Sequence, residues 1–416
     1  MDFFNRIPKM RRDRPQKTGA AVPGGISGRV AMVALAAAAC APRVARPPSA
    51  EDRLAARLQA RLDSLHAAGR FPGATVGVAL PGGRVLALAT GLADSSGAAM
   101  RPHDRMLAGS VGKTFVAAVA LQLVEEGKLR LDEPISTWLA AEPWFPNLPN
   151  ARNITVRMLM NHTSGLVRYE FGDAFVRDLN ANPDKRWTPA ERIAYILGTR
   201  PPFEAGRGWE YSDTNYIVLG AILERITGRT LEEEVERRVL EPDRLREVMA
   251  SDTVVLPGVV QGYAGPDNPF GRQATMIRGG RFIVNPQFEW AGGGYATSAP
   301  DLARWARLLW GGRAFGRPIL AQALDAVPAP MLGNGARYGL GVIVREGPLG
   351  PSYGHSGFFP GYLTDVRYYP RDDFSVALQF NTSTPRALPR PLGAMVEDLA
   401  RIVADELARA EGRAAP

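Results

Sequence analysis

Gly109-Ser110-Val111-Gly112-Lys113-Thr114 places a hydroxyl three residues before an amine, at the start of an apolar run with helical spacing. Successive residues on a helix rotate by about 100°, so Ser110 and Lys113 share one face. A lysine held in a partly dry cleft loses its proton more readily, because burial disfavours the ammonium form. An unprotonated amine can activate a neighbouring hydroxyl as a nucleophile. The stretch therefore predicts a nucleophilic Ser110 with Lys113 as its base.

The same stretch has two other interpretations. One is a solvated helical pair of serine and lysine with no chemical role. The other is the end of a nucleotide-binding loop, a motif that needs glycine at position 107 and a buried strand just before it. The chain has Leu107 there, and the preceding segment from Arg101 to Arg105 is polar. Nucleotide binding is therefore disfavoured. The surroundings of Ser110 and Lys113 must decide between a nucleophile with its base and a solvated pair.

The composition is that of a globular protein with a large core, in one large domain or two. The chain has 416 residues, of which 45% are hydrophobic and 22% charged, and its formal net charge is +8. Residues 1–40 contain seven Arg or Lys and two Asp, so +5 of this charge lies there. The other charges are mixed in sign along the expected helices, as on a solvated surface. This distribution argues against nucleic acid as a partner.

The N-terminus is typical of a targeting segment. A basic stretch precedes the ten apolar residues Val30–Ala39, which are too few to span a bilayer but suit the core of a signal peptide. Cys40 follows directly and is the only cysteine, so residues 1–40 resemble a bacterial lipoprotein signal. We expect lipid on Cys40 to anchor an exported protein on the periplasmic side of a membrane. The alternative is an unstructured tail with an incidental cysteine.

The pattern after the N-terminus predicts strands near both ends of the chain and helices between them. Residues 41–50 hold three prolines and are expected to form a tether. Ser49, with Asp52 three residues later, begins a helix whose apolar face ends at Gly69. Strands are expected at 74–80, 84–90, 338–344, 352–355, 363–369 and 374–381, and helices at 110–126, 189–197, 216–227, 231–240, from 298 onward and near 395–407.

Strands from the two ends can pair into one antiparallel sheet, with the first and last helices packed on it. The predicted fold class is therefore α/β, with an antiparallel sheet flanked by N- and C-terminal helices and a large, mostly helical insertion. We expect a single domain over residues 51–412. Its α/β part would comprise 51–109 and 330–412, and its mostly helical part 110–329.

Two further motifs carry side chains suited to proton transfer and substrate binding. Tyr211-Ser212-Asp213 comes about a hundred residues after Ser110, and a tyrosine hydroxyl near a lysine can relay a proton. Taken alone, it is more simply a capped helix start. His355-Ser356-Gly357 ends an expected strand, where a donor can hold a carboxylate or carbonyl and glycine allows close approach to the backbone. Its alternative is a histidine in a turn.

Two other motifs are expected to be structural. In Asn161-His162-Thr163-Ser164-Gly165, we expect His162 and Ser164 to satisfy the polar groups of a buried loop. Ala291-Gly292-Gly293-Gly294-Tyr295 is a glycine run that we expect to line a cleft. The four histidines of the chain show no spacing typical of metal ligands, so we expect neither a metal nor another cofactor.

Taken in this order, the motifs resemble those of the serine β-lactamase superfamily, in particular its branch of class C β-lactamases, D-Ala-D-Ala carboxypeptidases and esterases. Ser-x-x-Lys with a Lys-Thr-Gly element marks that superfamily. In this branch the second element is Tyr-x-Asn, and the third is Lys-Thr-Gly or His-x-Gly. The resemblance runs from about Phe71 to Asn381 and includes Ile154 to Leu166, Tyr216 to Gly220 and Gly354 to Tyr362. It implies a β-lactamase/transpeptidase-like fold.

The resemblance also implies a role for each matching residue. Ser110 would attack a carbonyl and form an acyl-enzyme, with Lys113 and Tyr211 moving protons. The backbone N–H groups of Ser110 and Phe358 would form the oxyanion hole. The substrate would be bound by Asp213, His355, Ser356 and Gly357.

Two positions depart from the pattern of this branch. Asp213 stands where asparagine is usual, and a carboxylate can only accept hydrogen bonds. It could pair with Lys113, which would raise the pKa of the lysine and weaken it as a base. His355 replaces lysine, and histidine there is more typical of carboxypeptidases and esterases than of efficient β-lactamases.

The predicted function is that of a serine hydrolase acting on a small-molecule or peptide substrate. It would be a D-Ala-D-Ala carboxypeptidase or an esterase, with at most weak β-lactamase activity. His355 and Ser356 would suit a terminal carboxylate, whereas Phe358 and Phe359 would suit an apolar acyl group. The alternative, which only Asp213 favours, is a non-catalytic member of the fold that binds a peptide or cell-wall fragment. The sequence leaves the oligomeric state open.

Overall fold

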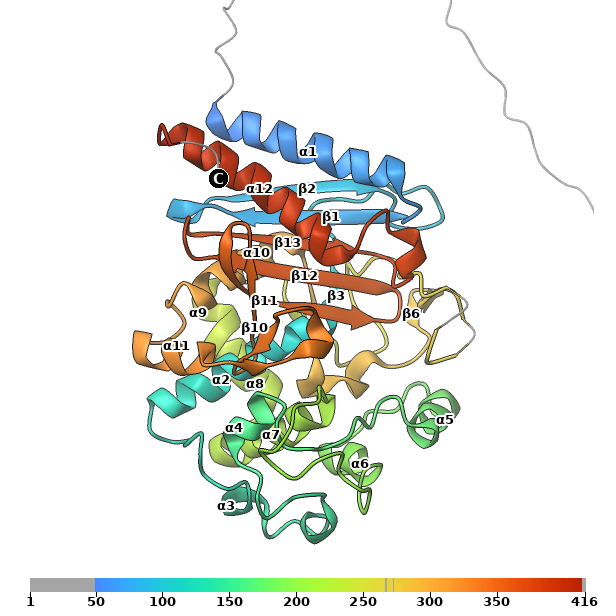
Figure 1. The fold of residues 1–416 in the computed structure, drawn as a ribbon. Helices are drawn as coiled ribbons and strands as arrows, with labels where there is room; N and C mark the ends of the chain where they lie inside the picture. The colour runs from blue at the N-terminus through green and yellow to red at the C-terminus, as the bar shows by residue number, and fades with distance from the viewer. Residues whose placement is uncertain (1–48, 266–267, 272, 414–416) are drawn as a thin grey trace, which may run out of the picture. The chain divides into compact units, whose positions relative to one another are not determined.

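A computed structural model describes residues 49–265, 268–271 and 273–413. The predicted signal segment with Cys40, and residues 41–48 of the predicted tether, lie outside the described residues. Within these residues, eight antiparallel strands form the main sheet, in the order β2-β1-β13-β12-β11-β10-β9-β8 (Figure 1). The strands are β1 (Gly73–Ala79), β2 (Val85–Gly91), β8 (Val327–Pro328), β9 (Arg337–Tyr338), β10 (Ile343–Gly347), β11 (Gly350–Phe359), β12 (Tyr362–Tyr369) and β13 (Phe374–Phe380).

The two ends of the domain meet in this sheet, as the sequence predicts. β1 pairs with β13 from Ala74↔Phe380 to Ala79↔Ser375, and it pairs with β2 through the predicted hairpin. The β-lactamase/transpeptidase-like arrangement of an antiparallel sheet between helices is therefore confirmed.

Helices α1 (Ala50–Ala68) and α12 (Leu392–Ala410) pack against each other on one face of the sheet (Figure 1). α1 begins at the predicted capping box, in which the backbone N–H of Asp52 donates to the Ser49 hydroxyl oxygen over 3.1 Å. Its apolar stripe is fully buried and consists of Leu54, Leu58, Leu62 and Leu65. The predicted positions of the first and last helices are confirmed.

Helix α10 (Ala299–Trp310) covers the other face and contacts β1, β12 and β13. A Cβ on Gly77 would stand 2.2 Å from the carbonyl oxygen of Ala299, so only glycine allows this close approach. Both α10 and β8 belong to the segment 110–329 that the sequence assigns to the helical part. The segment 110–329 thus contributes one helix that packs on the sheet and one strand that belongs to it. The proposed boundaries between the α/β part and the helical part stay a prediction.

The remaining helices and short strands build the rest of the domain. Its centre is formed by α2 and α7, which are apolar around most of their circumference and accordingly buried. The helices are α2 (Lys113–Glu125), α3 (Ser136–Leu139), α4 (Val156–Met160), α5 (Asp173–Ala181), α6 (Pro189–Ala194), α7 (Asp213–Thr227), α8 (Leu231–Val235), α9 (Glu241–Asp243) and α11 (Arg317–Leu324). The short strands are β3 (Met106–Leu107), β4 (Met249–Ala250), β5 (Ile277–Arg278), β6 (Arg281–Phe282) and β7 (Tyr295–Thr297).

The strand expected at 338–344 is wrong, because the chain bends between β9 and β10. Gly341 has φ +77°, a conformation that residues other than glycine rarely adopt. β11 is longer than expected, and β10 pairs with it only as far as Gly354. Beyond that point β11 pairs with β12 alone within the described chain, which leaves one edge of His355–Phe359 facing the catalytic motif.

No helix in the described ranges is both long and apolar enough to cross a membrane.

Candidate active site

Ser110 lies in a single 3₁₀ turn, η2 (Gly109–Gly112), which leads directly into α2. The shared face predicted from the sequence is confirmed, since the Lys113 Nζ atom is 3.0 Å from the Ser110 Oγ atom. Ser110 is partly exposed, whereas Lys113 is completely buried. The pair is therefore not a solvated surface pair.

Two glycines let the η2 turn lie against the edge of β11. A Cβ on Gly357 would stand 1.9 Å from the carbonyl oxygen of Ala108 and 3.3 Å from the backbone N of Ser110. A Cβ on Gly109, where φ is +52°, would stand 2.7 Å from the backbone N of Phe358. The two backbone N–H groups assigned to the oxyanion hole are thus brought to the same contact between turn and strand. Their catalytic role stays a prediction.

Lys113 has three polar neighbours. It forms an ion pair with Asp213 and donates to the carbonyl oxygen of Gly292, in addition to its contact with Ser110. Burial disfavours the ammonium, but the charge of Asp213 outweighs it and raises the pKa of Lys113 above its usual value. The predicted pairing of Asp213 with Lys113 is confirmed, and the lysine is an ammonium at neutral pH.

Asp213, the first residue of α7, also binds Arg168. Its Oδ2 atom accepts from the Arg168 Nη2 atom over 3.0 Å. Burial opposes ionisation of Asp213, but the charges of Lys113 and Arg168 outweigh it and hold the pKa of this carboxyl well below its usual value. Asp213 is therefore a fixed negative charge between two cations.

Tyr211 lies just before α7, and the centre of its ring is 5.0 Å from the Lys113 Nζ atom. Its hydroxyl is buried and interacts with the side chains of Lys113 and Ser110. Burial raises the pKa of Tyr211, while the charge of Lys113 acts in the opposite direction. The structure thus brings together Ser110, Lys113 and Tyr211, with the tyrosine as a neutral hydroxyl.

His355 has both ring nitrogens occupied. The Nδ1 atom is 2.7 Å from the carbonyl oxygen of Ser356, and the Nε2 atom is 2.8 Å from the Tyr338 hydroxyl. Because a carbonyl only accepts, Nδ1 carries the proton and Nε2 accepts from Tyr338. Burial, helped by the charge of Lys113, lowers the pKa of His355 to about 3. A role for this neutral ring in binding a carboxylate stays a prediction, and the ring has no spare N–H for one.

The side chains of His162 and Ser164 lie in a buried polar network, and their structural role stays a prediction. The Asn215 side chain links these two residues: its Nδ2 atom donates to the His162 ring over 3.0 Å, and its Oδ1 atom accepts from the Ser164 hydroxyl over 2.5 Å. In the glycine run, a Cβ on Gly293 would stand 2.7 Å from the Gly109 carbonyl oxygen, and Gly292 lines the cavity.

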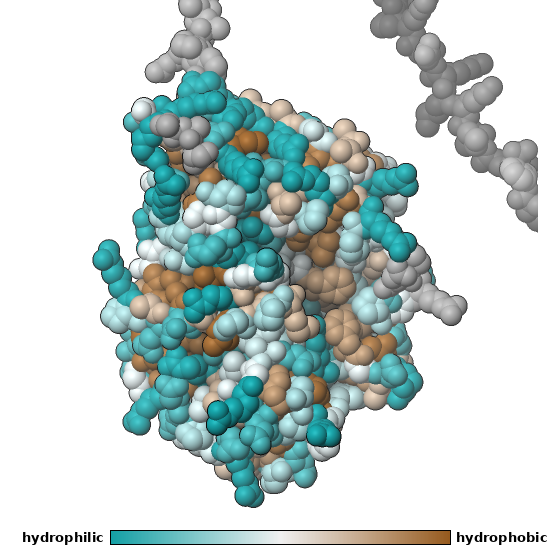
Figure 2. Space-filling view, viewed as in Figure 1, coloured by the Kyte–Doolittle hydropathy of each residue, from teal (hydrophilic) through white to brown (hydrophobic). Residues whose placement is uncertain are grey.

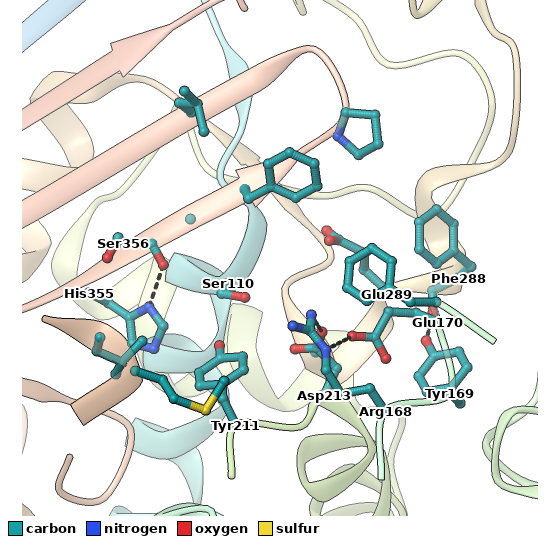
Figure 3. Close-up of a pocket in the computed structure, with 18 of the residues that line it drawn as sticks. Ser110, Arg168, Tyr169, Glu170, Tyr211, Asp213, Phe288, Glu289, His355 and Ser356 are labelled. Carbon is teal, nitrogen blue, oxygen red and sulfur yellow. Dashed lines mark hydrogen bonds and ion pairs between the residues drawn. The ribbon is translucent and has the colours of Figure 1, made fainter. Parts of the chain in front are cut away.

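A cavity of about 420 Å³ opens in front of Ser110, on a face where apolar side chains gather in a hollow (Figure 2). We call His355–Phe358 of β11 the strand wall. We call Arg168–Phe171, Asp213 and Phe288–Glu289 the loop wall. In Figure 3, His355 and Ser356 lie on one side of Ser110, and the charged side chains of the loop wall lie on the other.

Sequence reasoning missed the loop wall apart from Asp213. Arg168 and Glu170 follow the Asn161–Leu166 motif by a few residues, and Glu289 precedes the glycine run. Neither segment has a spacing that marks it as part of a site. Only their short distance in sequence from the Asn161–Leu166 motif and from the glycine run could have indicated these residues.

Among the residues that the structure describes, no group of three or more His, Cys, Asp or Glu side chains is arranged to hold a metal ion.

The chain matches the Beta-lactamase family over residues 54–400 and belongs to it. The resemblance seen in the sequence is thereby confirmed. Esterase EstB of Burkholderia gladioli is 36% identical over 203 residues, which are 47% of this chain and 51% of that protein. Putative penicillin-binding protein PbpX of Bacillus subtilis is 25% identical over 265 residues, 63% of this chain and 58% of that one. The matched region thus covers less than two thirds of the length of these two relatives.

Among solved structures, a D-stereospecific amidohydrolase from Streptomyces sp. superposes with a TM-score of 0.70. It is 27% identical, and the match covers 82% of this chain and 97% of that one. The names of these relatives span ester, amide and penicillin chemistry, which share attack on a carbonyl carbon.

Proposed function

We propose that the protein is a serine hydrolase that works through an acyl-enzyme on esters or amides with an apolar acyl group. The observation that carries this is the contact of the buried Lys113 with Ser110, which lines a cavity that also contains several phenylalanine side chains. The family and its hydrolase relatives support the same reaction class.

In the proposed mechanism, the Ser110 Oγ atom attacks the substrate carbonyl carbon and its proton passes to Lys113, directly or through Tyr211. The backbone N–H groups of Ser110 and Phe358 stabilise the oxyanion. Tyr211 returns the proton to the leaving group, and the acyl-enzyme forms. Water then hydrolyses the acyl-enzyme with the same groups in reverse roles.

The protonation of Lys113 limits this mechanism at neutral pH. An ammonium cannot accept the serine proton, and Asp213 stabilises the ammonium. A neutral amine has suitable partners in the same place, because it can donate to Asp213 and Gly292 while accepting from the Ser110 hydroxyl. The proposed hydrolysis therefore accelerates as the pH rises.

The site favours the predicted esterase, or an amidase, over the predicted carboxypeptidase. Arg168 is occupied by Asp213 and Glu170. Arg345, which donates to the Ser356 hydroxyl over 3.2 Å, does not line the cavity. With His355 neutral as well, the described residues that line the cavity offer a substrate carboxylate no free cation. The same argument predicts weak binding of anionic β-lactams.

A panel of three substrates tests the proposal: a short-chain p-nitrophenyl ester, an acyl-D-Ala-D-Ala peptide and nitrocefin. We expect turnover of the ester, with little or none of the peptide and nitrocefin. Rapid release of D-alanine would assign a carboxypeptidase instead. Inertness to all three, without covalent labelling of Ser110, would favour the non-catalytic binding role, for which the fixed Lys113–Asp213 ion pair is the one supporting observation.

We also propose that Cys40 carries lipid and anchors the exported protein on the periplasmic side of a membrane. The support is the signal-like sequence before it. Mass spectrometry of protein extracted from membranes should find a mature N-terminus at a lipid-modified Cys40. An unmodified Cys40 in that fraction would exclude the anchor.

A further inference from the structure

The loop wall contains a carboxylate that nothing in the described part of the chain neutralises. Glu289 lines the cavity and is only partly exposed, and its carboxyl has no hydrogen-bond or ion-pair partner in that part of the chain. Burial, together with the charge of Asp213, raises the pKa of Glu289 to about 8, against the opposing charges of Lys113 and Arg168. This carboxyl is therefore largely protonated at neutral pH.

A second carboxyl on the same wall is only half satisfied. Glu170 is 4% exposed, and its Oε1 atom accepts from the Arg168 Nε atom over 2.5 Å. Its Oε2 atom is buried and accepts no hydrogen bond from the described residues. The remaining side-chain partner of this carboxyl is the carboxylate of Asp213, to which Glu170 can donate only when it is protonated. Burial, with the charge of Asp213 nearby, raises the pKa of Glu170 well above its usual value. A buried, half-satisfied carboxyl lining a cavity needs an explanation.

The two carboxyls are held in place by the same contacts. The Tyr169 hydroxyl donates to the Phe288 carbonyl oxygen over 2.5 Å, which ties the segment bearing Glu170 to the segment bearing Glu289. Arg192 donates to the same carbonyl over 2.8 Å. The positions of the two carboxyls are therefore fixed by the buried structure behind them.

Aromatic rings complete this side of the cavity. The rings of Phe270 and Phe288 are 4.9 Å apart, and those of Phe171 and Phe270 are stacked at 6.1 Å. Carboxylates among aromatic faces are the combination that attracts an organic cation, because both supply negative charge or potential and the rings exclude water.

We propose that Glu289 and Glu170 form a subsite for the protonated amine of the substrate, so that the preferred acyl group is apolar and bears an amine close to the reacting carbonyl. This rests on the proposed hydrolase function. The carbonyl would lie at the Ser110 and Phe358 N–H groups, the amine on the loop wall, and the apolar substituent against the phenylalanine rings. The class of substrate is thus an ester or amide of an amine-bearing, apolar carboxylic acid.

The charges facing Glu289 predict how binding depends on pH. Lys113 from α2 and Arg168 supply two positive charges, Asp213 from α7 supplies one negative charge, Glu170 is a carboxyl with a raised pKa, and His355 and Tyr211 are neutral. A bound ammonium favours the ionised form of Glu289, so binding releases a proton below pH 8. Affinity for an amine should therefore rise between pH 6 and 8, where the ligand itself stays protonated, since amines titrate near pH 10.

The first test uses 2-phenylethylamine as the probe and 2-phenylethanol as its uncharged counterpart, in titration calorimetry at pH 7. We expect the amine to bind about tenfold tighter than the alcohol, as for a hydrogen bond to a charged group. The heat should differ between phosphate and Tris buffers, because a proton is released. Glu289→Gln should remove both the preference and the buffer dependence, and Glu170→Gln should weaken the preference. Glu346→Gln, at an exposed position on β10, should leave both unchanged.

Equal binding of amine and alcohol by the wild type, or buffer-independent heat, would overturn the subsite even if Glu289→Gln does not fold. The second test compares kcat/KM for phenylalanine p-nitroanilide and 3-phenylpropionyl p-nitroanilide, which differ only by the amine. Turnover of both at equal rates would refute the subsite and leave the hydrolase intact. Absence of all turnover, with the amine preference retained in calorimetry, would refute the hydrolase and keep the subsite.

Discussion

The two walls of the cavity differ in how they are built. The strand wall is neutral and internally satisfied: His355 has both nitrogens bonded, and Gly357 and Phe358 face the Ser110 turn through their backbone. The loop wall is charged and incompletely satisfied, with Asp213 shared by two cations and Glu289 without a partner in the described chain. In the proposed function, the strand wall contributes to the reaction that all ester and amide substrates share, whereas Glu289 and Glu170 of the loop wall select the substrate.

Lys113 contacts Ser110 and Asp213 of the loop wall, and its removal should have the largest effect. Lys113→Met removes the group that accepts the Ser110 proton and leaves Asp213 paired with Arg168 alone. We expect kcat/KM on a p-nitrophenyl ester to fall by about 10²–10⁴-fold. Lys128→Met, which removes an exposed lysine paired with Glu126, is the matched control and should keep full activity. Activity within tenfold of the wild type would remove Lys113 from the mechanism.

Gly357→Ala breaks the strand wall itself. The added Cβ would stand 1.9 Å from the Ala108 carbonyl oxygen, so the turn and β11 must separate. We expect a loss of about 1–3 kcal/mol in the free energy of unfolding and a loss of ester turnover. Gly347→Ala in the same sheet is the control, because its Cβ would meet no atom closer than 3.8 Å. If both variants unfold at the same temperature and hydrolyse the ester at the same rate, the close contact between Gly357 and Ala108 affects neither stability nor activity.

Asp213→Asn changes the charge of the loop wall while keeping its shape, and it restores the residue usual in the family branch. Without the carboxylate, the pKa of Lys113 falls and more of the lysine is neutral at pH 7. The rising limb of the kcat–pH profile should therefore move to lower pH by about one unit or more. The profile of an Asp63→Asn variant, altered on α1, should stay at the wild-type position. If the rising limb of the profile stays in place in Asp213→Asn, the ion pair with Asp213 does not control the basicity of Lys113.

Among these variants, Tyr338→Phe should have the smallest effect on stability and activity, and it tests whether His355 of the strand wall is structural. It removes the hydroxyl that occupies His355 Nε2 and leaves a neutral acceptor unpaired. We expect a cost of about 1 kcal/mol in the free energy of unfolding and a change in kcat/KM within about fivefold. A much larger loss of activity would mean that His355 takes part in the chemistry rather than in the structure of the wall.

The sequence predicted the Ser110–Lys113 pair and the strand wall well because their residues belong to regular elements. Helical periodicity places Ser110 beside Lys113, and strand patterns at both ends of the chain predict the sheet that carries His355. The bend between β9 and β10 was missed because two glycines interrupt a run that otherwise reads as one strand. Apart from Asp213, the loop wall was missed because Arg168 and Glu289 are 121 positions apart in irregular segments, and only tertiary packing brings them together.

The central claim is that Ser110 is a nucleophile activated in this cavity. Intact-protein mass spectrometry after incubation with a fluorophosphonate probe tests it most directly. The wild type should gain one adduct, located by peptide mapping on Ser110, and Ser110→Ala should gain none. An adduct of equal yield on Ser110→Ala, or no adduct on the folded wild type across pH 6–10, would contradict it.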